Sequence, residues 1–292
     1  MRQILRVILL VLPVFSFATQ TPSLKSGVDL AKAANESQSV IQIQNYIANR
    51  DYKSASKLGE KSYLRYKDSK IALYTGKSFF MQQNYDKAVK YFNLAANQGE
   101  ALAMLTLGNL YGSGTGVPKD IKKAVEWYQK AVAKGNVQAM NYLGLIYRDG
   151  LVGRPDYARA MNLFQLAANR HDAEGNFNLG YMYQNGLGIP VEMQKAIDSY
   201  TISASLGDMY AMNSLGYIYE NGIGVKPDKL HAFNWYTQAA AKGNANAQCK
   251  VGLAYFEGGR GVDKDLARAK TWFTIAQKSG CKTAASYLAQ IK

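Results

Sequence analysis

The sequence contains little histidine, cysteine or proline. Its 292 residues include six prolines and two cysteines, and the two histidines are His171 and His231. Neither histidine has a visible acid or nucleophile as a partner, and no His/Cys cluster has the spacing of metal ligands, which disfavours catalysis and metal binding. We therefore predict no catalytic residue, no metal, no cofactor and no enzymatic activity. The few prolines lie mostly in predicted loops or near the N-terminus, so they leave long stretches free to form uninterrupted helices.

No apolar segment at the N-terminus is long enough to span a membrane. The apolar run of residues 7–17 is interrupted by Pro13, whereas a span needs about 20 residues. Two arginines precede this run and small residues at positions 16–18 follow it, a pattern typical of a secretory signal peptide. We predict a cleaved signal peptide over residues 1–18, with an uncleaved anchor as the alternative, and a polar linker over 19–36.

Glycine recurs in this chain at one constant interval. Gly108 and Gly144 lie 36 residues apart, and the same step leads to Gly180, Gly216 and Gly252. A tyrosine stands three residues after each of these glycines, and another glycine stands three residues further on. A fixed period of this size indicates an array of structural repeats.

Each repeat has the pattern of two helices, which we call helix A and helix B. In the first full copy, Ala103, Leu107, Gly108 and Tyr111 share one face of a helix over residues 101–111. A glycine inside a helix costs about 1 kcal/mol relative to alanine, so its recurrence predicts that helix B packs too closely for a side chain. Helix B is expected to begin at an acidic capping residue and to end at a turn glycine. The acidic residues are Asp120, Asp156, Glu192, Asp228 and Asp265, the turn glycines are Gly135, Gly207 and Gly243, and His171 takes the glycine's place in one repeat.

This pattern resembles the Sel1-like repeats, which are relatives of tetratricopeptide repeats with a longer loop between the two helices. The residues that carry the resemblance read Ala103, Leu107-Gly108, Tyr111, Gly114, Gly116-Val117, Asp120, Lys123-Ala124, Trp127-Tyr128, Ala131 and Gly135. The resemblance implies an all-α fold, an α-solenoid with a right-handed superhelix of Sel1-like or tetratricopeptide-like helical hairpins. We predict two tetratricopeptide-like units over residues 37–99, five Sel1-like repeats over 100–280 and a C-terminal capping helix over 281–292.

The resemblance also implies a role in binding protein partners. In such stacks helix A lines the concave side, where tyrosine offers large contact area and asparagine can bond an extended peptide. The alternative is that part of this stripe only packs repeat against repeat. The predicted partner-binding residues are Asn109, Asn141, Arg148, Phe177, Tyr181, Gln184, Tyr210, Asn213, Tyr217 and Glu220.

The chain carries an excess of positive charge. The formal net charge is +14, which favours acidic partners or anionic envelope polymers. Lys53, Lys57, Lys61 and Arg65 stand four residues apart and form a basic ridge on one predicted helix, with a merely solvated face as the alternative. Predicted export disfavours nucleic acid as a partner.

Cys249 and Cys281 raise the question of a disulfide. A bond needs Cα atoms within about 7 Å, and one helical turn plus one step between helices is expected to exceed that distance. The sequence therefore favours two separate cysteines and leaves the bond open.

The function predicted from these features is a non-enzymatic scaffold or adaptor, periplasmic or secreted from a bacterium, that binds a segment of another protein on its concave helix-A side. The resemblance leaves two alternatives open, a weak cell-wall or β-lactam hydrolase and a secreted host-interacting factor. The carboxylates that a hydrolase could use are Glu174, Glu220 and Glu257.

Overall fold

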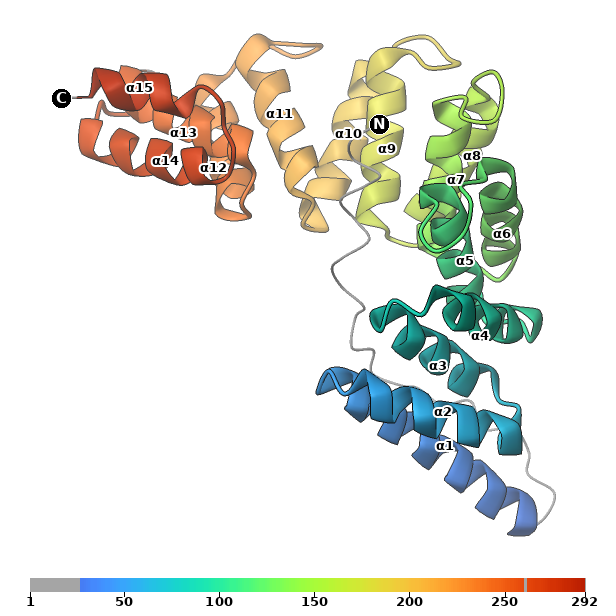
Figure 1. Cartoon of the computed structure of the whole chain (residues 1–292). Helices are drawn as coiled ribbons and strands as arrows, with labels where there is room; N and C mark the ends of the chain where they lie inside the picture. The colour runs from blue at the N-terminus through green and yellow to red at the C-terminus, as the bar shows by residue number, and fades with distance from the viewer. Residues whose placement is uncertain (1–26, 260–261, 292) are drawn as a thin grey trace. The chain divides into compact units, whose positions relative to one another are not determined.

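The computed structural model describes residues 27–259 and 262–291, whose regular structure consists of helices (Figure 1). The predicted signal peptide, residues 1–18, lies outside the described residues. The helices are α1 Gly27–Ala48, α2 Tyr52–Tyr66, α3 Ser69–Met81, α4 Tyr85–Asn97, α5 Ala101–Ser113, α6 Ile121–Ala133, α7 Val137–Arg148, α8 Tyr157–Ala168, α9 Ala173–Asn185, α10 Met193–Ser205, α11 Met209–Asn221, α12 Lys229–Ala241, α13 Ala245–Glu257, α14 Leu266–Lys278 and α15 Ala284–Gln290.

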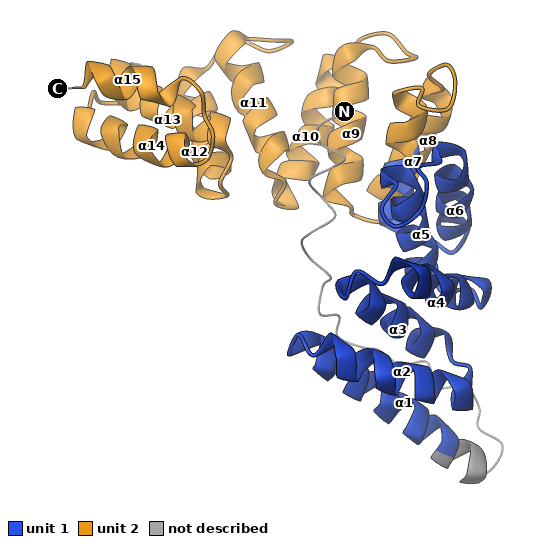
Figure 2. Cartoon of the chain, viewed as in Figure 1, with its two compact units in different colours: residues 1–143 blue, residues 144–292 orange. Residues whose placement is uncertain are grey.

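Each helix packs on its neighbours in the chain. The pairs with the most extensive contact are α3 with α4, α5 with α6, α9 with α10, α11 with α12 and α13 with α14, which are the helix A and helix B of one repeat. The predicted all-α fold, an α-solenoid of helical hairpins, is confirmed. Two compact units make up the chain, residues 1–143 (unit 1) and 144–292 (unit 2), and α7 crosses the boundary (Figure 2).

The first helix begins earlier than the composition indicates. α1 starts at Gly27, inside the segment 19–36 that we predicted as a polar linker, so the second part of that segment is helical. Alanine, leucine, lysine and glutamate, which favour helix, are frequent there, and α1 packs along α2 and α3. Its buried anchor is Ile43.

The repeated glycines allow each helix A to lie directly against an aromatic ring of its helix B. A Cβ atom added at Gly108 would lie 2.5 Å from the Tyr128 ring, and one added at Gly216 would lie 2.6 Å from the Tyr236 ring. The same relationship joins Gly144 to Phe164, Gly180 to Tyr200 and Gly252 to Phe273. Each of these rings is buried. The close helix contact that the glycine period predicts is therefore confirmed.

The acidic residues before helix B cap it as expected. Asp120 Oδ1 accepts from the Lys123 amide at 3.0 Å, and Asp156, Asp228 and Asp265 do the same in their repeats. Glu192 makes no such side-chain bond. At the other end of helix B, His171 has a φ of 57°, which places it in the left-handed region where glycine stands in other repeats, so its predicted turn position is confirmed.

The residue three positions after the acidic residue that precedes helix B packs on the tyrosine of helix A in the same repeat. In unit 1, Lys123 pairs with Asp120 and lies 5.4 Å above the Tyr111 ring. Arg159, Lys195 and Arg268 occupy the same place in unit 2. His231 replaces the cation in one repeat and packs 4.2 Å from the Tyr219 ring. This histidine is thus part of the packing.

A disulfide closes the C-terminal end of unit 2. Cys249, in the interior of α13, is bonded to Cys281, and their Cα atoms are 6.6 Å apart. The expectation of a longer distance was wrong because the turn at Gly280 after α14 brings the chain back onto α13. The short capping helix α15 then packs through Tyr287, whose ring stacks 4.8 Å from that of Phe273.

Candidate protein-binding face

Exposed tyrosines mark the helices A of unit 2. On α9 and α11, the exposed large apolar side chains are Tyr181, Tyr210 and Tyr217, with 39%, 48% and 49% of their surface accessible. Tyr181 and Tyr217 stand 36 residues apart, in the same position of successive repeats. A tyrosine in such a position can bury a large area against a partner at low entropic cost.

Phe177 packs against one of these exposed tyrosines, Tyr210. It is half-buried, and its ring lies 6.4 Å from the ring of Tyr210 on α11 and 5.6 Å from the ring of Tyr200 on α10. Phe177, which we predicted to bind a partner, therefore packs between two repeats and helps to fix the position of Tyr210. We use the term helix-A face for the surface of unit 2 that carries Arg148, Phe177, Tyr181, Gln184, Tyr210, Asn213, Tyr217 and Glu220.

Arg148 reaches the helix-A face from the end of α7. Its Nε donates to Asp149 Oδ1 at 2.7 Å, and its guanidinium lies 5.2 Å from the centre of the Tyr181 ring. This cation–π contact limits the freedom of the tyrosine. Arg148 thus helps to hold the Tyr181 ring in place.

Gln184 and Glu220 accept hydrogen bonds from buried tyrosines of helix B. Tyr200 donates to Gln184 Oε1 and Tyr236 donates to Glu220 Oε2, both at 2.8 Å. In unit 1, Tyr128 donates to Asn109 Oδ1 at 2.7 Å. Desolvation raises the pKa of all three tyrosine hydroxyls, so they remain protonated donors. These three predicted binding residues therefore have a structural role, because each accepts a hydrogen bond from a buried tyrosine of helix B.

Two asparagines of the predicted binding set differ in burial. Asn213 on α11 is half-buried, whereas Asn141 on α7 is completely buried. The predicted partner-binding role of Asn141 does not fit this placement. Leu105 and Cys249 hold the same position in their repeats and are also buried, whereas Phe177 and Asn213 at that position are half-buried.

A family model of the Sel1 repeat matches residues 66–100, 101–136, 137–172, 173–208, 210–244 and 245–280. The chain belongs to the Sel1 repeat family. The first matched repeat covers part of the segment 37–99 that we predicted as tetratricopeptide-like, and α3 and α4 in it are joined by a short turn.

Solved structures of other Sel1 repeat proteins have the same fold. A Sel1 repeat protein from Oxalobacter formigenes is 28% identical, with a TM-score of 0.72, over 82% of this chain and 99% of that one. A protective antigen of uropathogenic Escherichia coli strains, described as displaying an SLR fold, is also 28% identical, with a TM-score of 0.71, over 90% of this chain. The chain spans 58% of the length of that antigen. No curated protein matches the sequence.

Membership in the family gives the general class of function. Sel1 repeat proteins mediate protein–protein interactions, and the fold is generally a non-catalytic scaffold. Of the three carboxylates considered for hydrolysis, Glu220 is ion-paired with Lys250, whose Nζ lies 2.7 Å from the Glu220 carboxylate. None of the described helices is both long and apolar enough to cross a membrane.

Glu174, which we considered from the sequence only as a carboxylate for hydrolysis, is a titratable residue with a shifted pKa. It lies in the first turn of α9, close to the capping residues Asp172 and Asp208 of α9 and α11. Desolvation, together with the negative charges of these two aspartates, raises the pKa of Glu174 to about 7. The sequence carries a signal for this shifted pKa, because Glu174 stands two residues after the capping acid Asp172.

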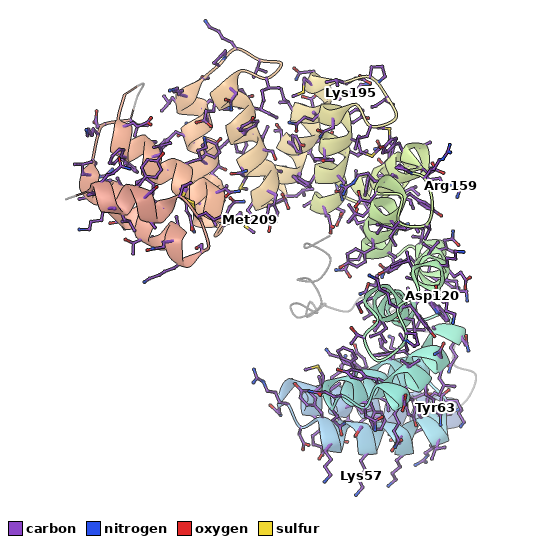
Figure 3. All side chains as sticks on the ribbon, turned by 45° about the horizontal axis from the view of Figure 1, so that its top comes forward. Lys57, Tyr63, Asp120, Arg159, Lys195 and Met209 are labelled. Atoms are coloured by element: carbon purple, nitrogen blue, oxygen red, sulfur yellow. A yellow bond between two sulfur atoms is a disulfide. The ribbon has the colours of Figure 1, made fainter. Side chains whose placement is uncertain are left out.

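The basic ridge lies in unit 1, on the outer side of α2. Lys53, Lys57, Lys61 and Arg65 are all exposed, as the prediction of a charged surface requires. Lys57 points away from the neighbouring helices (Figure 3).

Proposed function

We propose that this Sel1 repeat protein is a non-enzymatic scaffold that binds an extended segment of a partner protein on its helix-A face. The observation that carries the proposal is the exposure of Tyr181, Tyr210 and Tyr217 on neighbouring helices. The polar residues beside them are committed to bonds inside the stack. The tyrosines are therefore the side chains whose accessible surface a partner can bury.

The energetics of binding support this choice of residues. Tyrosines enclosed at the centre of an interface commonly cost 2 kcal/mol or more when truncated to alanine. The rings are also already positioned, Tyr181 by Arg148 and Tyr210 by Phe177, so little ordering is required on binding.

We further propose that the protein acts after export, in the periplasm or outside a bacterial cell. The basic and apolar N-terminal segment supports export. The disulfide between Cys249 and Cys281 also supports it, because such bonds persist in oxidising compartments.

Site-specific photocrosslinking in the native cell tests the binding face. A benzophenone amino acid at position 217 should form a crosslinked product with a partner, identified by mass spectrometry. The matched control is position 202 on α10, where Ile202 is also 49% exposed but lies on a helix B. Equal crosslinking at both positions would contradict a specific helix-A site.

Affinity for the crosslinked partner then tests the individual rings. Tyr181→Ala and Tyr217→Ala should each weaken binding at least tenfold, whereas Ile202→Ala should leave it unchanged. Loss of stability with unchanged affinity would show that the rings only pack. A β-lactam hydrolysis assay on the pure protein addresses the enzymatic alternative, and turnover there would contradict a purely scaffolding role.

A further inference from the structure

The basic ridge of α2 has an arrangement that the packing of unit 1 does not explain. Lys53, Lys57, Lys61 and Arg65 follow one another at four-residue steps, about 6 Å apart along the helix axis, and all are exposed. Like charges at this spacing repel each other and weaken a helix. The ridge therefore reduces the stability of α2.

Internal acids do not neutralise the ridge. The acidic residue within α2, Glu60, is ion-paired with Lys87 of α4 at 3.0 Å. Among the ion pairs of the described residues, none includes a member of the ridge. The surplus positive charge is directed to the solvent.

An exposed leucine lies within the ridge. Leu64 has 71% of its surface accessible, more than any other large apolar side chain in the described part of the chain. At 100° per residue, it projects within the arc that the four cations span. An anionic bilayer offers headgroups to cations and an apolar boundary to such a side chain, whereas a soluble polyanion offers only charge.

We propose that Leu64 and the four cations of the basic ridge form a docking surface for an anionic phospholipid bilayer. Phosphate headgroups pair with the lysines and arginine while Leu64 enters the acyl boundary. Each cation strengthens such binding about fivefold, and the attraction declines as salt shortens the Debye length. This contact is peripheral and separate from the helix-A face, so the two surfaces can fail independently.

Cosedimentation of the full chain with vesicles tests the charges. Phosphatidylcholine vesicles containing phosphatidylglycerol are compared with pure phosphatidylcholine, and the N-terminal segment is the same in every variant. Lys57→Gln/Lys61→Gln should lower partitioning onto the anionic vesicles about 25-fold. The control Lys270→Gln/Lys278→Gln removes the same charge from exposed positions on α14 and its C-terminal turn and should change it less than about twofold.

The leucine distinguishes a bilayer from a soluble polyanion. Leu64→Ser should weaken vesicle binding about tenfold, with no effect on binding to soluble polyphosphate, and Ile275→Ser on α14 serves as its control. Equal losses from the two lysine pairs would overturn the proposal. It would also be overturned if Leu64→Ser had no effect while the ridge variant lost polyphosphate and vesicles alike. Far-UV circular dichroism verifies that every variant keeps its helices.

Discussion

The Tyr236 hydroxyl donates a hydrogen bond to the Glu220 carboxylate at 2.8 Å, and the same carboxylate accepts from Lys250 Nζ at 2.7 Å. Glu220 thereby links α11 to α12 within its repeat and to α13 of the next. One repeat earlier, Gln184 accepts from Tyr200 in the same way. The helix-A face thus contains a layer of structural hydrogen bonds beside exposed tyrosines. Residues that hold the stack together are therefore distinct from the tyrosines that we propose to bind a partner.

The charge on Glu220 should make its bond with Tyr236 stronger than the neutral bond of Tyr200. We expect Tyr236→Phe to lower the free energy of unfolding by about 1.5–3 kcal/mol and Tyr200→Phe by about 0.5–1.5 kcal/mol. Urea unfolding followed by circular dichroism measures both. Glu220→Gln should reduce the difference between the two tyrosine variants. Equal effects of Tyr236→Phe and Tyr200→Phe in the parent protein would argue against a special role of the carboxylate.

The repeated helix-A glycine should not accept even one methyl group. Gly108→Ala places a Cβ 2.5 Å from the buried Tyr128 ring, so we expect a loss of about 1–3 kcal/mol of unfolding free energy. Gly112→Ala, one turn later in α5, meets its nearest atoms at 3.7 Å. This control should stabilise the protein by about 0.5–1 kcal/mol through helix propensity. Thermal unfolding of the two variants measures the contrast, and a tolerated alanine at position 108 would show that the ring can move.

The spacing of the glycines and aromatic rings was sufficient to predict the helical hairpins, because each glycine contacts a ring of its own repeat. The separation from Gly108 to Tyr128 is fixed by two helices and one loop, so the contact recurs whenever the period does. The role of Gln184 could also have been predicted. A tyrosine stands 16 residues after Gln184 and after Glu220, whereas a phenylalanine without a hydroxyl stands 16 after Arg148.

Two features could not be predicted from the sequence: the burial of residues at the edge of a helix face, and the disulfide. Asn141 and Asn213 hold equivalent repeat positions, yet one is completely buried and the other half-buried, because neighbouring side chains decide the outcome there. The disulfide depends on whether the Cα atoms lie just within or just beyond about 7 Å. The turn at Gly280 determines this distance, and helical periodicity does not describe that turn.

Removal of the disulfide should destabilise the C-terminal end of unit 2. The bond between Cys249 and Cys281 closes a sequence separation of 32 residues, for which chain entropy predicts about 3.5 kcal/mol of stabilisation. Cys249→Ala/Cys281→Ala should therefore increase amide hydrogen exchange in α14 and α15, measured by mass spectrometry, and leave α3–α6 unchanged. A reducing agent should reproduce this effect in the parent protein and have none in the double variant. Unchanged exchange in α14 and α15 would mean that packing of Tyr287 alone holds the cap.

The raised pKa of Glu174 predicts a pH dependence of stability with a definite sign. Its pKa is about 7 in the folded protein, above the usual 4.5 of a glutamate, so the folded state binds the proton more tightly and stability is lost as pH rises from about 5 to 7. Glu174→Gln should therefore stabilise the protein at pH 8, by about 1 kcal/mol at most, because part of the residue remains accessible despite the desolvation of its carboxyl group and solvent there screens the charge. At pH 5 the variant and the parent should be equal. Urea unfolding at both pH values measures this difference, with Glu257→Gln on α13 as the exposed control. A gain that is the same at pH 5 and pH 8 would mean that the substitution acts through helix propensity, because protonation of Glu174 can contribute only when the pH crosses its pKa.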